Sequence, residues 1–222
     1  MGDIKVYAFD AYGTLFDVHS AVAQHKARLG ERAAAVSQLW RRKQLEYTWL
    51  RTLMGRYADF AVVTDEALRF ALRRFQIDDD KLRQALLRAY RHLDAYPEAP
   101  AVLRRLRQRG ARCVVLSNGS PAMLDAAVQS SGIAEWLDAV ISVDAVGVYK
   151  PDPRVYQLLT QRFALPAQAI AFQTANGWDA AGAKAFGFHV AWIDRGGQTA
   201  ETLPFAPDRR LRDLTGLLAP DA

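Results

Sequence analysis

With 222 residues, of which 50% are hydrophobic and 24% charged, the chain is long enough for one sizeable core and has the composition of a globular protein. The 29 basic and 24 acidic residues leave a net charge of +5, but the arginines are spread along helical segments, so we expect no nucleic-acid partner. The single cysteine, Cys113, rules out a disulfide framework. Neither a signal peptide nor a membrane-spanning apolar run is visible, which favours a cytoplasmic protein without membrane contact.

The first predicted element is a strand at Val6–Phe9, an apolar run that ends at a turn signal. Asp10 is the first polar residue after it, and open α/β sheets bind their ligands at the carboxyl ends of strands. Gly13 leaves the backbone free to curl around a group that meets Asp10. Taken alone, Asp10 is better explained as a turn cap. The polar groups after the later strands reverse that preference.

Between residues 16 and 96 the sequence pattern is helical throughout. Apolar residues recur three and four apart, glycines follow the first two helices, and acids occupy the first turns of the later ones. We expect an all-helical cap domain at 16–96, inserted after the first strand and lying over the carboxyl edge of the sheet. The predicted helices are His19–Leu29, Glu31–Met54, Asp65–Phe75 with Thr64 as its cap, and Asp79–Leu93 with Asp78 as its cap.

After Tyr96 strands and helices alternate, which is typical of a parallel sheet with helices on both faces. The predicted fold is an α/β, Rossmann-like, doubly wound parallel sheet whose core domain comprises 1–15 and 97–222. No element is predicted after Gly196 and Gly197. In order, the predicted elements are a helix at Pro100–Arg109, a strand at Ala111–Ser117, a helix from Ser120-Pro121, a strand at Ala139–Val143, a helix after Pro153, a strand at Ala169–Phe172, a helix through Lys184 and a strand at His189–Ile193.

Polar clusters follow the predicted strands at the positions where parallel strands would end at one edge. Each cluster alone is a common turn or helix start, and Asn176 and Asp179 could simply cap the helix that they precede. Chance placement of four such clusters in this order is a poor explanation. The clusters are Asp10 with Thr14, Ser117-Asn118-Gly119-Ser120, Lys150-Pro151-Asp152-Pro153, and Thr174-Ala175-Asn176-Gly177-Trp178-Asp179.

The residue types in these clusters suit catalysis by a carboxylate nucleophile. Such a nucleophile has to stay ionised, and an ammonium close to it, here that of Lys150, favours the ionised form. The hydroxyl of Ser117 and the amide of Asn118 suit an anionic group of a substrate, while Asp179 suits a role in orienting or activating water. The plain alternatives are a surface salt bridge for Lys150 and a helix cap for Ser117.

With these clusters, the chain resembles the haloacid dehalogenase superfamily and, within it, the L-2-haloacid dehalogenases (haloacid dehalogenase type II). The resemblance spans Phe9–Phe188 and therefore most of the chain. It is carried by the segments FDAYGTLFDVHS, WRRKQLEYTWLRTLM, SNGS, YKPDPRVY and NGWDAAGAKAFGF.

The resemblance implies a hydrolase that converts (S)-2-haloalkanoic acids to (R)-2-hydroxyalkanoic acids and halide without a metal or cofactor. Asp10 would attack the α-carbon and displace halide with inversion, which leaves an aspartyl ester. Water activated near Asp179 and Lys150 would then hydrolyse the ester at the Asp10 carboxyl carbon. The physical logic agrees, because a halide leaves faster when its growing charge meets a guanidinium in a dry site. The resemblance also implies a homodimer.

The resemblance assigns roles to the other site residues as well. Thr14, Thr174 and Asn176 would position the reacting groups, and Tyr156 would support Lys150. Ser117, with backbone amides near Tyr12 and Asn118, would hold the substrate carboxylate. The halide would be received by Arg41 and Asn118, and the alkyl group would be enclosed by Tyr12, Leu45, Phe60 and Trp178.

Two positions depart from the family pattern. Members often carry an uncharged amide where this chain has Arg42, and Ser-Ser-Asn where it has Thr174-Ala175-Asn176. Thr174 keeps the hydroxyl. Arg42 either places a second cation beside Arg41, with an effect on substrate size or halide preference, or faces solvent.

Two other functions are open to the same sequence. A magnesium phosphatase of this superfamily would carry a second Asp two positions after the nucleophile, where this chain has Tyr12, and usually an acid where it has Asn176. A non-catalytic interaction module would not require Asp10, Arg41, Lys150 and Asp179 together. Halide release from (S)-2-chloropropionate in the presence of a chelator separates the three functions.

Overall fold

The computed structural model describes residues 4–219 and contains a six-stranded parallel sheet with the strand order β3-β2-β1-β4-β5-β6. The last residue of β1, Phe9, pairs with Val115 of β2 and Gln173 of β4. Asp10 therefore leaves the sheet in the middle of its carboxyl edge. The strands are β1 (Val6–Phe9), β2 (Arg112–Ser117), β3 (Ala139–Ser142), β4 (Ile170–Thr174), β5 (His189–Ile193) and β6 (Arg209–Leu211).

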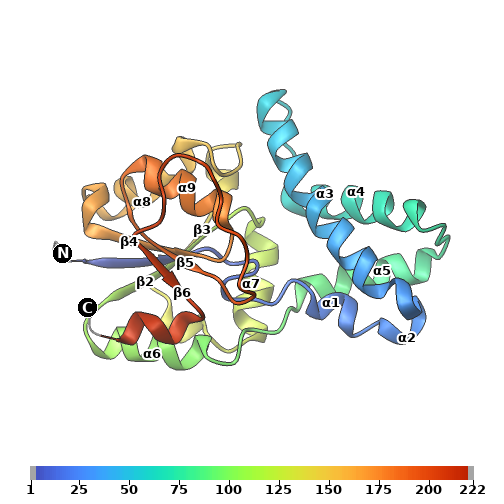
Figure 1. Ribbon diagram of the computed structural model, residues 1–222, viewed down its shortest axis with the longest axis horizontal. Coiled ribbons are helices and arrows are strands. Elements are labelled where there is room, and N and C mark those ends of the chain that lie inside the picture. The colour runs from blue at the N-terminus through green and yellow to red at the C-terminus, as the bar shows by residue number, and fades with distance from the viewer. Residues whose placement is uncertain (1–3, 220–222) are drawn as a thin grey trace.

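Helices cover both faces of this sheet, as Figure 1 shows. Helices α8 (Pro153–Phe163) and α9 (Gly177–Phe186) lie on one side, and α6 (Ala99–Gln108) lies on the other with the short helix Leu214–Leu218. Helix α7 (Pro121–Ser130) packs against β3. Because both faces are covered, central strands can be apolar along their whole length, as Cys113–Leu116 is. This arrangement confirms the predicted doubly wound α/β fold.

The part of the chain between β1 and α6 forms a helical lobe beyond the carboxyl edge of the sheet (Figure 1). The chain enters and leaves this lobe through two stretches that lie side by side. Asp17 N donates to Asp94 O at 2.8 Å, and Tyr96 N donates to Leu15 O at 2.9 Å. The lobe is built from α1 (Ser20–Ala23), α2 (Lys26–Leu29), α3 (Ala33–Leu53), α4 (Phe60–Arg74) and α5 (Asp80–Arg91).

The helix starts within the lobe differ from the predictions. The predicted helix His19–Leu29 is wrong, because the backbone leaves the helical region at His25 (φ −113°, ψ 17°) and two one-turn helices result. Helix α4 begins at Phe60, since the Asp59 side chain accepts hydrogen bonds from two backbone amides of its first turn. Thr64 is therefore no cap but a buried residue inside α4. The cap of α5 is Asp79, one residue after the predicted Asp78.

The sixth strand, β6, was missed by the sequence analysis. It is only three residues long, it carries two arginines, and it pairs on one side only, with β5. An apolar run or a regular alternation is the usual signal of a strand, and three residues show neither.

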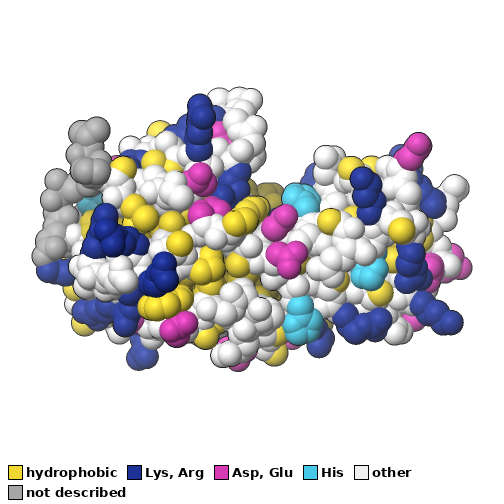
Figure 2. Space-filling model, turned by 90° about the horizontal axis from the view of Figure 1, so that it is seen from below, with side chains coloured by type: hydrophobic (Ala, Val, Ile, Leu, Met, Phe, Trp, Pro, Cys, Tyr) yellow, Lys and Arg dark blue, Asp and Glu magenta, His cyan; other side chains and the backbone are white. Residues whose placement is uncertain are grey.

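The surface gives two further observations. Lys and Arg side chains are interspersed with acidic and uncharged ones over the face that Figure 2 shows, on the core and on the helical lobe alike. Within residues 4–219, no helix has both the length and the apolar character that crossing a membrane requires.

The helix-cap assignment leads to a stability prediction. Asp59→Ala removes the carboxylate oxygen that accepts from Ala61 N at 2.8 Å and Val62 N at 3.0 Å. We expect the free energy of unfolding to fall by about 1 kcal/mol, the usual cost of losing an N-cap, in a urea titration. Asp78→Ala is the matched control, because Asp78 is exposed and caps no helix. Equal losses in the two variants would contradict the assignment.

Candidate active site

Asp10 lies at the centre of a buried polar cluster at the carboxyl edge of the sheet, with 6% of its surface exposed. Its Oδ1 atom accepts a hydrogen bond from Lys150 Nζ at 3.0 Å. Its Oδ2 atom accepts from Asn176 Nδ2 at 2.9 Å and from Thr14 Oγ1 at 3.2 Å. These donors come from three separate segments of the chain, so the carboxylate is held in one orientation by the fold.

Lys150 joins Asp10 to a second carboxylate. Its Nζ atom lies 3.0 Å from Asp10 Oδ1 and 3.0 Å from Asp179 Oδ2, and the lysine is only 1% exposed. Burial alone lowers the pKa of Lys150, but the charges of Asp10 and Asp179 outweigh it, so that its pKa is raised. Lys150 is therefore a permanently charged ammonium between two acids, and the surface salt bridge considered for it is wrong.

Asp179 is fully buried and is held on both sides. Lys150 occupies Oδ2, and Tyr156 Oη donates to Oδ1 at 2.7 Å. Burial raises the pKa of Asp179, with a smaller contribution from the charge of Asp10, while Lys150 and Tyr156 oppose the shift. A buried carboxylate with a raised pKa is suited to accept a proton from water near neutral pH. Tyr156 was predicted to support Lys150, and the structure differs, since its hydroxyl contacts Asp179.

A glycine allows Tyr156 to come this close to α9. A Cβ atom on Gly182 would lie 2.7 Å from Tyr156 Oη and 2.6 Å from Pro151 Cβ. Real Cβ atoms do not make such contacts, so any other residue at position 182 would displace the tyrosine or the Lys150-Pro151 segment. Gly182 therefore belongs to the construction of the site.

The turn after β4 positions Asn176. Thr174 Oγ1 accepts from Asn176 N at 3.1 Å, and Thr14 Oγ1 accepts from Ala175 N at 2.8 Å. Asn176 is the N-cap residue of α9, but its side chain makes no cap bond and reaches Asp10 instead. The departure from Ser-Ser-Asn leaves these bonds intact, because Thr174 uses its hydroxyl and Ala175 its backbone amide.

The turn after β2 brings Ser117 and Asn118 to the same edge. Ser117 is fully buried, and its Oγ atom accepts from Gly119 N at 3.1 Å. Asn118 Oδ1 accepts from Lys150 N at 3.1 Å, which ties the turn to the segment that carries the lysine. The hydroxyl hydrogen of Ser117 has no acceptor within residues 4–219.

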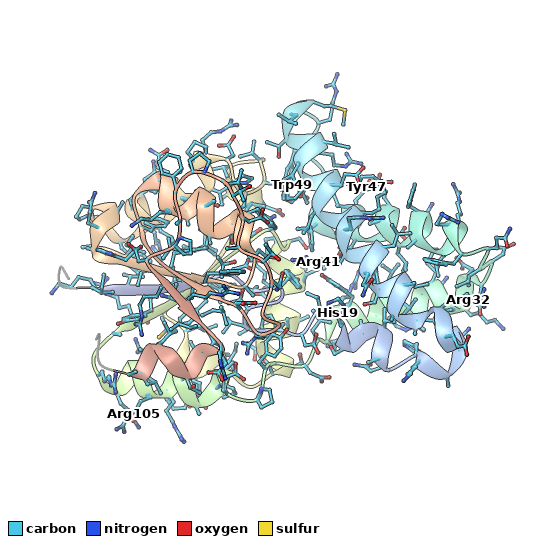
Figure 3. All side chains as sticks on the ribbon, viewed as in Figure 1. His19, Arg32, Arg41, Tyr47, Trp49 and Arg105 are labelled. Atoms are coloured by element: carbon cyan, nitrogen blue, oxygen red, sulfur yellow. The ribbon has the colours of Figure 1, made fainter. Side chains whose placement is uncertain are left out.

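The helical lobe contributes Arg41 from α3, which points toward the core in Figure 3. Its Nη2 atom donates to Tyr12 O and to Asn176 Oδ1, each at 3.3 Å. Arg41 and Leu45 line one side of a cavity of about 330 Å³ between lobe and core. On the other side the cavity is lined by Asn176, Trp178 and Arg195, among others.

Aromatic rings close the site beside Tyr12. Its ring centroid lies 5.5 Å from that of Phe60, the first residue of α4, and 5.5 Å from that of Tyr90. The buried Tyr12 hydroxyl has no hydrogen-bond partner among the described residues. Tyr12 of the core and Phe60 of the lobe are therefore in contact at the junction of the two bodies.

Two residues at the junction were missed in the sequence. Trp49 packs edge-on against Trp178, with ring centroids 5.3 Å apart. Arg195 donates from Nη2 to Thr14 O at 3.0 Å and forms an ion pair with Glu98. The helical spacing of Trp49 from Arg41 and Leu45 would have indicated the first, and the place of Arg195 just after β5 the second.

Arg42 is exposed and makes no hydrogen bond or ion pair with any residue in the range 4–219. Of the two explanations considered for it, the solvent-facing one agrees with the structure.

Comparison with known proteins decides the family. The model of the haloacid dehalogenase-like hydrolases matches residues 4–187. The chain belongs to this family. The chain is 46% identical to the (S)-2-haloacid dehalogenase of Pseudomonas sp. (strain YL), over 98% of this chain and 94% of that one. It is 42% identical to haloacetate dehalogenase H-2 of Moraxella sp. (strain B), over 94% and 93% of the two chains.

Solved structures of family members share the whole architecture. A dehalogenase solved with an intermediate complex is 42% identical, with a TM-score of 0.95 over 98% of this chain and 97% of that one. The L-2-haloacid dehalogenase of Xanthobacter autotrophicus, solved with chloropropionic acid covalently bound, is 39% identical, with a TM-score of 0.90 over 96% of each chain.

Cationic side chains contact several oxygen atoms of the site. Asp10 and Asp179 share Lys150, and Tyr12 O and Asn176 Oδ1 accept from Arg41. The part of the chain that the structure describes contains no group of three or more His, Cys, Asp or Glu side chains placed to hold a metal ion.

The charges around Asp179 lead to a pH prediction. If its carboxylate accepts the proton of water, turnover falls when Asp179 becomes protonated, and this occurs above the ordinary value of 3.8 because its pKa is raised. Since Tyr156 lowers this pKa, Tyr156→Phe should move the acid limb of the kcat profile to higher pH. The raised pKa of Lys150 predicts no loss of its charge below its ordinary value of 10.5. An acid limb that moves to lower pH in Tyr156→Phe would contradict this role of Asp179.

Proposed function

We propose that the chain is an (S)-2-haloacid dehalogenase, a hydrolase that converts (S)-2-haloalkanoic acids to (R)-2-hydroxyalkanoic acids and halide. The observation that carries the proposal is the buried ion cluster Asp10–Lys150–Asp179 with the Arg41 guanidinium opposite it. A nucleophilic carboxylate, an ammonium that keeps it charged, a second carboxylate for water and a cation for the leaving group are together what this reaction needs. The named relatives and the covalently bound chloropropionic acid of the Xanthobacter structure support it.

In the first step a carboxylate oxygen of Asp10 attacks the α-carbon of the substrate. A carbon–oxygen bond forms, the carbon–halogen bond breaks with inversion, and the halide leaves with its electron pair. Arg41 and Asn118 receive the halide. The positive charge of the guanidinium stabilises the negative charge that develops on the halide.

In the second step water attacks the carboxyl carbon of the Asp10 ester. Asp179, oriented by Tyr156 and Lys150, takes a proton from the water. The bond between the carboxyl carbon and the ester oxygen breaks, and the proton passes to the departing alkoxide. The carboxylic acid left at Asp10 releases its own proton to solvent, which restores the carboxylate with one oxygen from water. Thr14, Thr174 and Asn176 hold the Asp10 side chain and the turn beside it throughout.

The substrate carboxylate is held by the free hydroxyl hydrogen of Ser117 and by backbone amides near Tyr12 and Asn118. The alkyl group is enclosed by Tyr12, Leu45, Phe60 and Trp178. Of these residues, Leu45 of the lobe and Trp178 of the core line the same cavity as Arg41. Residues 16–96 act as the cap domain over a core of 1–15 and 97–222, of which residues 1–3 and 220–222 lie outside the described range.

We further propose a homodimer in the cytoplasm. The magnesium phosphatase has no specific support in the site, since position 12 is a tyrosine and the residue opposite Asp10 on the β4 turn is the amide Asn176.

The central prediction concerns the nucleophile. Asp10→Asn should lower the rate of halide release from (S)-2-chloropropionate by a factor on the order of 10⁴ or more, as removal of a nucleophile does. The circular dichroism spectrum should stay that of the parent. Asp78→Asn, an exposed aspartate away from the site, should release halide at the parent rate. Halide release by Asp10→Asn at a rate near the parent's would refute the mechanism.

A second prediction concerns the covalent intermediate and the metal. Acid-quenched enzyme should carry the mass of the 1-carboxyethyl group, bound as an ester, on the peptide that contains Asp10, and a single turnover in ¹⁸O-water should label Asp10 before the product. Halide release should be unaffected by a chelator, because Lys150 and Arg41 supply the positive charge. Label in the product alone would mean direct attack by water. Loss of activity on chelation, with turnover of phosphate esters, would favour the phosphatase.

A further inference from the structure

Two tyrosines join the helical lobe to the core on the side of Lys150. Tyr57, in the turn between α3 and α4, donates a hydrogen bond through Oη to Asp144 of the core. In the opposite direction, Tyr149 Oη of the core donates to Ala58 O of the same turn at 2.6 Å. The two rings pack together, with centroids 5.0 Å apart. These contacts, which we call the tyrosine latch, are separate from the chain crossings at Leu15–Asp17 and Asp94–Tyr96.

The latch is continuous with the segment that carries Lys150. Tyr149 N donates to Thr52 Oγ1 of the lobe at 3.1 Å, and the next amide, Lys150 N, donates to Asn118 Oδ1 of the core at 3.1 Å. Consecutive backbone amides are therefore bound to opposite sides of the junction. A displacement of the lobe would therefore also displace the backbone of Lys150, whose ammonium contacts Asp10.

Asp144 connects the latch to the turn after β2. Asp144 N donates to Ser142 Oγ at 3.1 Å, and Ser142 Oγ donates to Gly119 O at 2.6 Å. Gly119 directly follows Asn118. The carboxylate that Tyr57 binds thus belongs to a turn that is bonded to the loop of Ser117 and Asn118.

Burial and protonation of the two tyrosines favour stable hydrogen bonds in the latch. Tyr149 is fully buried and Tyr57 is half-buried. Burial is the largest cause that raises the pKa of each phenol, so both hydroxyls stay protonated and act as donors at physiological pH. The bond from Tyr57 to the Asp144 carboxylate is charge-assisted, which makes it stronger than a bond between neutral groups.

We propose that Tyr57, Tyr149 and Asp144 fix the position of the helical lobe relative to the core and thereby position Lys150 and Asn118 at Asp10. This proposal rests on the proposed dehalogenase function. Neither tyrosine hydroxyl contacts Asp10 or Asp179, so Tyr57 and Tyr149 are positioning residues. Arg41 comes from the lobe and Lys150 from the core, and both must face Asp10 when the carbon–halogen bond breaks. The latch sets their relative placement.

The test compares single-oxygen variants. Tyr57→Phe and Tyr149→Phe each remove one hydroxyl and keep the ring. Tyr47→Phe is the matched control, because Tyr47 packs against Phe70 and lies on the side of α3 away from the core in Figure 3. The measurements are kcat and KM for (S)-2-chloropropionate, and amide hydrogen exchange of residues 52–59.

We expect both latch variants to lower kcat on the order of tenfold while KM changes less than threefold, because misplaced charges weaken transition-state binding more than substrate binding. Amides at 52–59 should exchange faster, and those at 15–17 and 94–96 should not change. Tyr47→Phe should keep the parent kcat within twofold.

Three results would overturn the proposal: parent kcat in both latch variants, a kcat loss explained entirely by the unfolded fraction at the assay temperature, or an equal loss in Tyr47→Phe. If the fully buried Tyr149→Phe does not fold, Tyr57→Phe and Asp144→Asn decide. Failure of the proposed function is a different result, since the parent enzyme would then release no halide from (S)-2-chloropropionate.

Discussion

The structure depends on one lysine that is buried between two carboxylates. An unpaired charge inside a protein costs several kcal/mol, and only close partners of opposite charge offset this cost. Lys150, with both carboxylates at 3.0 Å, meets this condition, but only if the ends of β1, the segment before α8 and the first turn of α9 converge on one point. The parallel sheet provides the convergence, because its strands all end at the same edge. Gly182 and Tyr156 then hold the second carboxylate at the required distance.

The helical lobe completes a site that the sheet leaves open. Its guanidinium, Arg41, meets oxygen atoms of the core that carry partial negative charge, namely Tyr12 O and Asn176 Oδ1. The lobe is attached to the core at the two chain crossings and again through Tyr57 and Tyr149. Arg41 belongs to the lobe and is therefore placed by the same attachments. Under the proposed function, a substrate anion that meets Arg41 would compete with the contacts that Arg41 makes with the core, which would link binding to the placement of the lobe.

Most of the fold was predictable because it follows from local patterns of burial. The first five strands are short, mainly apolar runs, and all five were found, with β1 and β5 at their observed bounds. The helix starts at Phe60 and Asp80 were misplaced, since several residues near each start can cap and the choice depends on the side chain that reaches the first-turn amides. Strand β6 has too little pattern of its own and forms because β5 offers an unpaired edge.

In the site, too, some features could be predicted from local sequence patterns and others could not. The residue types and their places at strand ends indicated the chemistry of Asp10, Lys150, Ser117 and Asp179 from the chain alone, because parallel strands bring their ends together in any fold of this class. Contacts between lobe and core lay beyond local patterns. That Arg42 faces solvent and that Trp49, Tyr57 and Tyr149 lie at the junction depend on how two separately packed bodies meet. Such a meeting joins Arg41 to Asn176, 135 positions apart, and no periodicity along the chain encodes it. The contacts of Tyr156 with Asp179 and of Arg195 with Thr14 lie within the core and depend on how distant core segments pack together.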